Sequence, residues 1–109
     1  MIQNYINHIV FVIDASGSMQ KISREVIDVF NKQVTYLAKR SQEVNQETRV
    51  SVYLFNDTVT CLIYDMDVMR LPKLNGHYHA RGGTALIDGV IQAILDLKKP
   101  PNFMEIMRF

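Results

Sequence analysis

One carboxylate and two hydroxyls follow one another closely in the segment Asp14-Ala15-Ser16-Gly17-Ser18. Carboxylate and hydroxyl oxygens are the hard donors that Mg²⁺ and Mn²⁺ prefer. The segment directly follows residues 9–13, an apolar, β-branched run that is too short for a helix and predicts a strand buried on both faces of a parallel sheet. In open α/β sheets, ligands bind at the carboxyl ends of strands. The order of strand, Asp-x-Ser-x-Ser and helix therefore predicts a metal site formed by a loop.

A second polar segment, Gly82-Gly83-Thr84, lies much further along the chain. The two glycines allow positive φ angles or a close approach of the backbone to a ligand. Thr84 stands where the N-cap of a helix is expected. By itself this segment is typical of a flexible turn before a capped helix. Beside the first segment, Thr84 offers a third hydroxyl to the same cation.

The elements that must position these residues can be read from the periodicity. Apolar residues at helical spacing predict an amphipathic helix of about 20 residues after Met19; they are Ile22, Val26, Phe30, Val34 and Leu37. A polar loop is expected at 41–47, and strands at 49–55 and 58–64 are expected to form an antiparallel hairpin. Residues 65–80 read as a long connection with one helical turn at 67–71, and a second helix opens at Gly82-Gly83-Thr84 and ends before Pro100-Pro101.

The amino-acid composition argues against several classes of function. The chain has 109 residues, 48% apolar and 21% charged, with a net charge of +1, as expected for one small globular domain. Its scattered cations argue against nucleic acid as a partner, and no apolar run approaches the roughly 20 residues of a membrane span. The single cysteine, Cys61, cannot form an internal disulfide and is expected to be a small strand residue. Without a recognisable signal peptide, we expect a cytoplasmic protein.

Asp14-Ala15-Ser16-Gly17-Ser18-Met19 and Gly82-Gly83-Thr84-Ala85-Leu86 resemble the metal-ion-dependent adhesion site of von Willebrand factor type A domains. The resemblance extends from residue 9 to about residue 97 and implies a Rossmann-like, doubly wound α/β sheet. It also implies that Ser16, Ser18 and Thr84 coordinate Mg²⁺ or Mn²⁺, with Asp14 acting largely through water. An acidic side chain of a partner protein is then expected to take the remaining position on the metal. The implied function is metal-bridged protein binding and not catalysis.

The sequence departs from the family after the second helix. The family places a further aspartate after the next buried strand, whereas the sequence ends at Phe109 with no such aspartate. We therefore expect a single, C-terminally truncated domain over residues 1–109, with three strands and two main helices. Lacking a fourth strand, residues 9–13 are expected to present an open edge that favours a homodimer or aggregation. Residues 103–109 are either a shortened end that packs over this gap or the trace of a truncated gene.

Two other functions compete with metal-dependent binding. A strand that ends in Asp14-x-Ser16 also resembles haloacid-dehalogenase-type phosphatases, in which the aspartate is the nucleophile. That chemistry requires a second acid two residues on, and the residue here is Ser16. The other alternative is a remnant of the family that binds no metal and serves only as a structural or interaction piece.

The remaining polar residues are assigned to structure. His77 and His79 have the spacing of a zinc-binding pair, but no third ligand is evident, which favours a surface loop. Asp88 can be proposed as a substitute carboxylate, but its place in the first turns of a helix explains it more simply. Asn56-Asp57 is interpreted as the turn of the hairpin.

Overall fold

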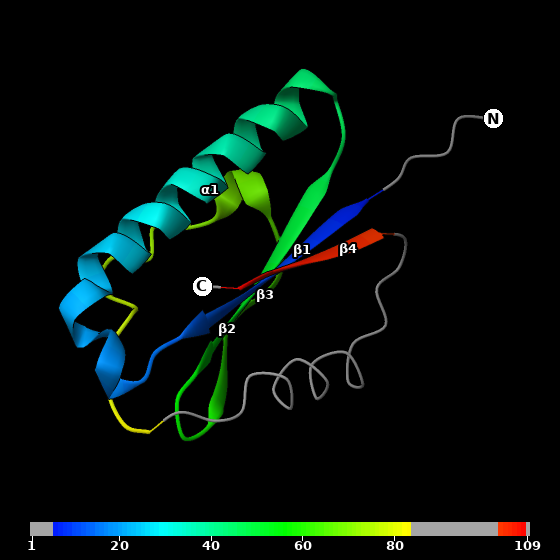
Figure 1. Ribbon diagram of the computed structural model, residues 1–109. Coiled ribbons are helices and arrows are strands. Elements are labelled where there is room, and N and C mark those ends of the chain that lie inside the picture. Colours follow the sequence, from blue (N-terminus) through cyan, green and yellow to red (C-terminus); the bar gives the residue numbers. More distant parts are fainter. Residues whose placement is uncertain (1–5, 84–102, 109) are drawn as a thin grey trace.

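Four strands form one mixed sheet in the order β3-β2-β1-β4, and the fold is α/β (Figure 1). The computed structural model describes residues 6–83 and 103–108. Along the chain the elements are β1 (Asn7–Asp14), the 3₁₀ helix η1 (Gly17–Ile22), α1 (Ser23–Glu43), β2 (Thr48–Phe55), β3 (Val59–Asp67), the 3₁₀ helix η2 (Val68–Arg70) and β4 (Phe103–Arg108). The predicted second helix lies outside the described residues.

The central strand β1 is buried on both faces, as its apolar sequence predicts. Residues 9–13 are all at most 3% exposed. β1 runs parallel to β2, in a register that pairs Asn7 with Thr48 and Asp14 with Phe55. Burial on both faces explains why the strand shows no alternation of apolar and polar residues. Asp14 therefore lies at the carboxyl end of this central strand.

The expectations of three strands and of an open edge on β1 are wrong. β4 pairs with β1 in parallel, from Asn7 with Phe103 to Val12 with Arg108, so β1 has a neighbour on each side. Parallel neighbours need a connection of a dozen or more residues, and β1 and β4 are separated by far more than that along the chain. Six residues suffice for a strand of ordinary length. The expected homodimer or aggregate through residues 9–13 therefore loses its structural basis.

The predicted hairpin is present, with β2 and β3 antiparallel. Its turn is closed by a hydrogen bond from the Asn56 amide to the Thr58 carbonyl, 2.9 Å long. β2 lies inside the sheet, and for this reason Ser51 and Tyr53 are buried together with the apolar residues of the opposite face. Cys61 lies exposed on β3, an edge strand of the described sheet.

Helix α1 lies along one face of the sheet and closes the core (Figure 1). Val26 and Phe30 are buried, and the Phe30 ring meets Phe11 of β1 edge-on, with the ring centroids 5.0 Å apart. Ile22 departs from the predicted apolar stripe. It is 43% exposed because it ends η1 and precedes α1. The helix also extends to Glu43, three residues into the predicted polar loop.

The connection after β3 contains the predicted helical turn and returns to the sheet end. The Asp67 side chain caps η2 by accepting a 3.0 Å hydrogen bond from the Met69 amide. Further on, the Asn31 side chain of α1 accepts a 3.0 Å hydrogen bond from the Leu74 amide, and Leu74 is buried. These contacts fix the path that leads to Gly82-Gly83. In residues 6–83 and 103–108, no helix has the length and apolar character needed to cross a membrane.

Candidate metal centre

The loop after β1 gathers its polar side chains around one short turn. Asp14 is half-buried at the strand end, and its Oδ1 accepts a 2.8 Å hydrogen bond from the Ser16 amide. Ser16 is 1% exposed, whereas Ser18 is exposed. Their hydroxyl oxygens lie 3.0 Å apart, within hydrogen-bonding distance. The Asp-x-Ser-x-Ser pattern thus brings a carboxylate and two hydroxyls together, as the sequence predicts.

The spacing of the two hydroxyls is compatible with a small divalent cation. Mg²⁺ binds oxygens at about 2.1 Å in octahedral geometry, so neighbouring ligands are about 3.0 Å apart. Ser16 Oγ and Ser18 Oγ have this separation. A buried hydroxyl beside an exposed one is also suited to an ion that is held on one side and open on the other. The donors present therefore fit Mg²⁺ or Mn²⁺ in chemistry and in spacing.

The second predicted segment meets the first through the backbone. The Gly17 amide donates a 2.9 Å hydrogen bond to the Gly82 carbonyl, and the Arg81 amide donates a 2.8 Å hydrogen bond to the Ala15 carbonyl. The loop after β1 and residues 81–83 are thus joined as two short adjacent strands would be. Thr84 lies outside the described residues, and its place near the serines stays a prediction. The described part of the segment, Gly82-Gly83, lies next to the loop after β1.

The hairpin turn contributes contacts that its assignment as a simple turn does not include. The Asn56 side-chain amide donates a 3.0 Å hydrogen bond to the Arg81 carbonyl, and Asp57 Oδ1 accepts a 2.8 Å hydrogen bond from the Gly83 amide. Three segments distant in sequence therefore meet at one end of the sheet (Figure 1). From the sequence, Asn56-Asp57 is interpreted only as a turn, and the one signal for a wider role is that these polar residues follow the carboxyl end of β2.

Tyr78 is a second residue whose role the sequence does not reveal. Its buried hydroxyl donates a 2.5 Å hydrogen bond to the backbone carbonyl of Asp14. Burial, with a smaller contribution from the negative charge of Asp14, raises the pKa of Tyr78 to about 12. The phenol therefore stays protonated and continues to donate at neutral pH. Two residues on, the Ala80 carbonyl accepts a 3.1 Å hydrogen bond from the Gln20 side chain of η1.

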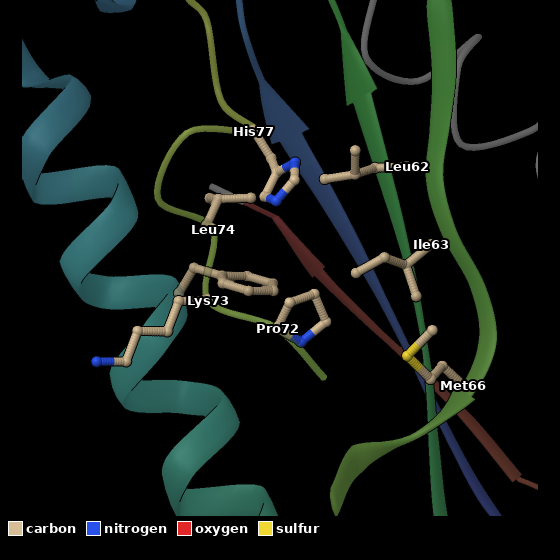
Figure 2. Close-up of a pocket in the computed structure, with 8 residues that line it drawn as sticks. Leu62, Ile63, Met66, Pro72, Lys73, Leu74 and His77 are labelled. Atoms are coloured by element: carbon tan, nitrogen blue, oxygen red, sulfur yellow. The ribbon is translucent and has the colours of Figure 1, made fainter. Parts of the chain in front are cut away.

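The other candidate residues do not converge on a site. His77 and His79 are both exposed, and no cluster of three or more His, Cys, Asp or Glu residues occurs within residues 6–83 and 103–108. A cavity of about 230 Å³ lies between α1 and β3, where Leu62, Ile63 and Met66 face the connection that carries Leu74 (Figure 2). Its lining is mostly apolar, so it lacks the oxygen donors of a hard-metal site. The Asp14 loop remains the strongest candidate.

These observations define a class of protein. In an α/β core, the central strand leads into a loop that carries a carboxylate and two hydroxyls, and Gly82 is hydrogen-bonded to the backbone of this loop. The family model of the von Willebrand factor type A domain matches residues 8–95, and the chain belongs to this family. A search of curated proteins and a search of solved structures each found no match. The matched range includes both predicted site segments, Thr84 among them.

Proposed function

We propose that the chain is a protein-interaction module that binds its partner through a divalent metal ion. Asp14, Ser16, Ser18 and Thr84 would hold Mg²⁺ or Mn²⁺, and a carboxylate of the partner would complete the coordination. Membership of the von Willebrand factor type A family supports an interaction module. The metal and the partner's carboxylate are the further steps of the proposal.

The observation that carries the proposal is the pair of hydroxyls. Ser16 Oγ and Ser18 Oγ lie 3.0 Å apart, a separation that neighbouring ligands of an octahedral ion would also have, in a turn that the Asp14 carboxylate stabilises. A hydroxyl ligand is neutral, so a cation held by several hydroxyls keeps most of its positive charge. An incoming carboxylate would then gain a strong attraction to the ion at the exposed side of the site. This charge balance favours binding of an acidic partner and requires no catalytic group, which is why we propose no enzymatic activity.

The metal step is tested by titrating the isotope-labelled chain with Mn²⁺ and recording amide spectra. We expect selective broadening of the resonances of Ser16, Ser18 and Gly83, because paramagnetic relaxation falls off steeply with distance. The double variant Ser16→Ala/Ser18→Ala should remove this broadening while leaving the spectrum folded. Ser41→Ala is a matched control, because the Ser41 hydroxyl donates to the Gln46 carbonyl at the far end of α1. Metal binding that survives the double substitution would show that the site is assigned wrongly.

The partner step uses short peptides that differ in one group. In the presence of Mn²⁺, a peptide that contains one aspartate should shift the Ser18 resonance, and its asparagine counterpart should not. Addition of a chelator should abolish the shift. A folded chain whose spectrum ignores Mn²⁺ would favour the alternative of a structural piece without metal binding. Equal binding of both peptides would remove the partner's carboxylate from the proposal.

A further inference from the structure

The carboxylate of Asp57 lies against both glycines of the Gly82-Gly83 pair. Its Oδ1 accepts a 2.8 Å hydrogen bond from the Gly83 amide. A β-carbon placed on Gly82 would lie 2.8 Å from Asp57 Oδ2, closer than real β-carbons approach. A β-carbon on Gly83 would collide with Oδ1. The space that the two missing side chains leave open is therefore filled by one carboxylate.

The two glycines are needed for different reasons. Gly82 has φ of +79°, a conformation that other residues adopt only with strain, so glycine is required there whatever surrounds it. Gly83 is outside that positive-φ region, and its backbone would accept alanine. A side chain at Gly83 would meet the carboxylate of Asp57, which would have to turn away and give up its hydrogen bond to the Gly83 amide. The second glycine is thus linked to the contact with Asp57.

The turn that presents Asp57 is itself fixed. The Asn56 amide donates to the Thr58 carbonyl, and Asn56 Oδ1 accepts a 3.2 Å hydrogen bond from the Thr58 amide. The Asn56 side chain also holds the Arg81 carbonyl. On its other side, residues 81–83 are bound to the loop after β1 through Gly17 and Gly82. Residues 81–83 are therefore hydrogen-bonded to the hairpin turn on one side and to the loop that carries Ser16 and Ser18 on the other.

We propose that Asp57 is a positioning residue for the metal site. Its carboxylate fixes the backbone of Gly83, the residue bonded to Thr84, through the hydrogen bond that the Gly83 amide donates to it. The effect on metal affinity rests on the function proposed above, whereas the contact with Gly83 can be tested without metal. Asp57 does not coordinate the ion in this proposal, and its role requires an acceptor oxygen in place, not a negative charge.

The first test compares two substitutions of Asp57 by Mn²⁺ titration. Groups that orient metal ligands typically change the affinity by roughly 10-fold to 100-fold when they are removed, so Asp57→Ala should weaken Mn²⁺ binding by about 10-fold or more. Asp57→Asn keeps an oxygen for the Gly83 amide and should bind Mn²⁺ within about threefold of the unmodified chain. Asp57→Ala with unchanged affinity would overturn the proposal. Equal losses in both variants would overturn it as well, because they would assign Asp57 a charge-dependent role.

The second test is a double-substitution cycle measured without metal. Gly83→Ala should lower the melting temperature by about 4 °C or more when Asp57 is present, and by clearly less in the Asp57→Ala background, where the collision is removed. Gly76→Ala is the matched control. Gly76 also has a positive φ, +78°, but nothing lies within 4 Å of its missing β-carbon, so its effect should be the same in both backgrounds.

The outcomes separate this proposal from the function on which it partly rests. Equal effects of Gly83→Ala in both backgrounds would overturn the role of Asp57, whatever the metal does. If the cycle is strongly coupled but the unmodified chain binds no Mn²⁺, the function proposed above fails and Asp57 is a structural contact only, which also overturns its role as a positioning residue for a metal site. Coupling together with the Asp57→Ala and Asp57→Asn pattern supports both.

Discussion

The hydroxyl of Tyr78 donates a 2.5 Å hydrogen bond to the backbone carbonyl of Asp14, 64 positions earlier in the chain. Asp14 is the last residue of β1, so this bond ties the long connection to the end of the central strand. The side chain of Asp14 accepts a separate hydrogen bond, from the Ser16 amide. Tyr78 therefore fixes the backbone at Asp14 without contributing a ligand to the candidate site.

Removal of this hydroxyl should weaken the fold by a measurable amount. We expect Tyr78→Phe to lower the free energy of unfolding by about 1–2 kcal/mol, because the carbonyl of Asp14 loses its buried partner while the ring stays in place. Urea denaturation measures the difference. Tyr36→Phe is the control, since Tyr36 is 61% exposed on α1 and its loss should change stability by less than about 0.5 kcal/mol. Equal effects of both substitutions would contradict the assigned role of Tyr78.

The raised pKa of Tyr78 predicts how stability depends on alkaline pH. The pKa is about 12 in the folded chain against 10.0 for an ordinary tyrosine. Above pH 10 the unfolded state releases the proton while the folded state retains it, so the stabilisation present below pH 10 is lost as the pH rises towards 12. The expected loss is about 2–3 kcal/mol.

Denaturation curves recorded between pH 9 and pH 12 should show this decline, and Tyr78→Phe should make it shallower. Tyrosinate absorbance offers an independent check. The phenol of Tyr78 should titrate well above the ordinary tyrosine value of 10.0. A decline of the same slope in Tyr78→Phe would show that other groups govern alkaline unfolding.

The sequence predicts the local part of this molecule well. The β1 strand, the hairpin and the helical turn at η2 follow from signals that act over a few residues, such as the continuous apolar run of β1 and the alternation in β2. Asp14, Ser16 and Ser18 are predicted together because five consecutive residues form one turn. Family membership is also predictable, since two spaced motifs agree and the family model covers both.

Contacts between distant segments could not be predicted in the same way. Nothing in the pattern around Asp57 or Tyr78 indicates that each would bond to a particular backbone group elsewhere. β4 escaped prediction because a short apolar segment after two prolines shows no period of its own, and its strand character depends on β1 beside it. Apolar spacing predicts Ile22 on the stripe of the helix, because spacing alone cannot locate the change from η1 to α1.

Phe30 should be the α1 residue whose loss is most costly. It is fully buried, and its ring meets Phe11 of β1 edge-on. Phe30→Ala should lower the free energy of unfolding by about 3–5 kcal/mol, which is much of the stability of a small domain. Val29→Ala, one residue earlier and 45% exposed, should cost less than about 1 kcal/mol. Thermal unfolding by circular dichroism compares the two, and similar melting temperatures would contradict the packing of α1 described above.

The pairing of β4 with β1 predicts what happens when β4 is removed. A chain shortened by residues 103–109 would expose the backbone amides and carbonyls along one side of β1, whose side chains are among the most apolar of the molecule. Exposed apolar strand edges pair with other chains, so the shortened chain should form dimers or larger aggregates at concentrations at which the full chain forms fewer. Light scattering after size exclusion measures the difference.

Deletion of Phe109 alone is the control, because it leaves β4 (Phe103–Arg108) intact and should behave as the full chain does. If the shortened chain has the same mass distribution as this control, β4 does not protect β1, and the sheet order β3-β2-β1-β4 would be contradicted in solution.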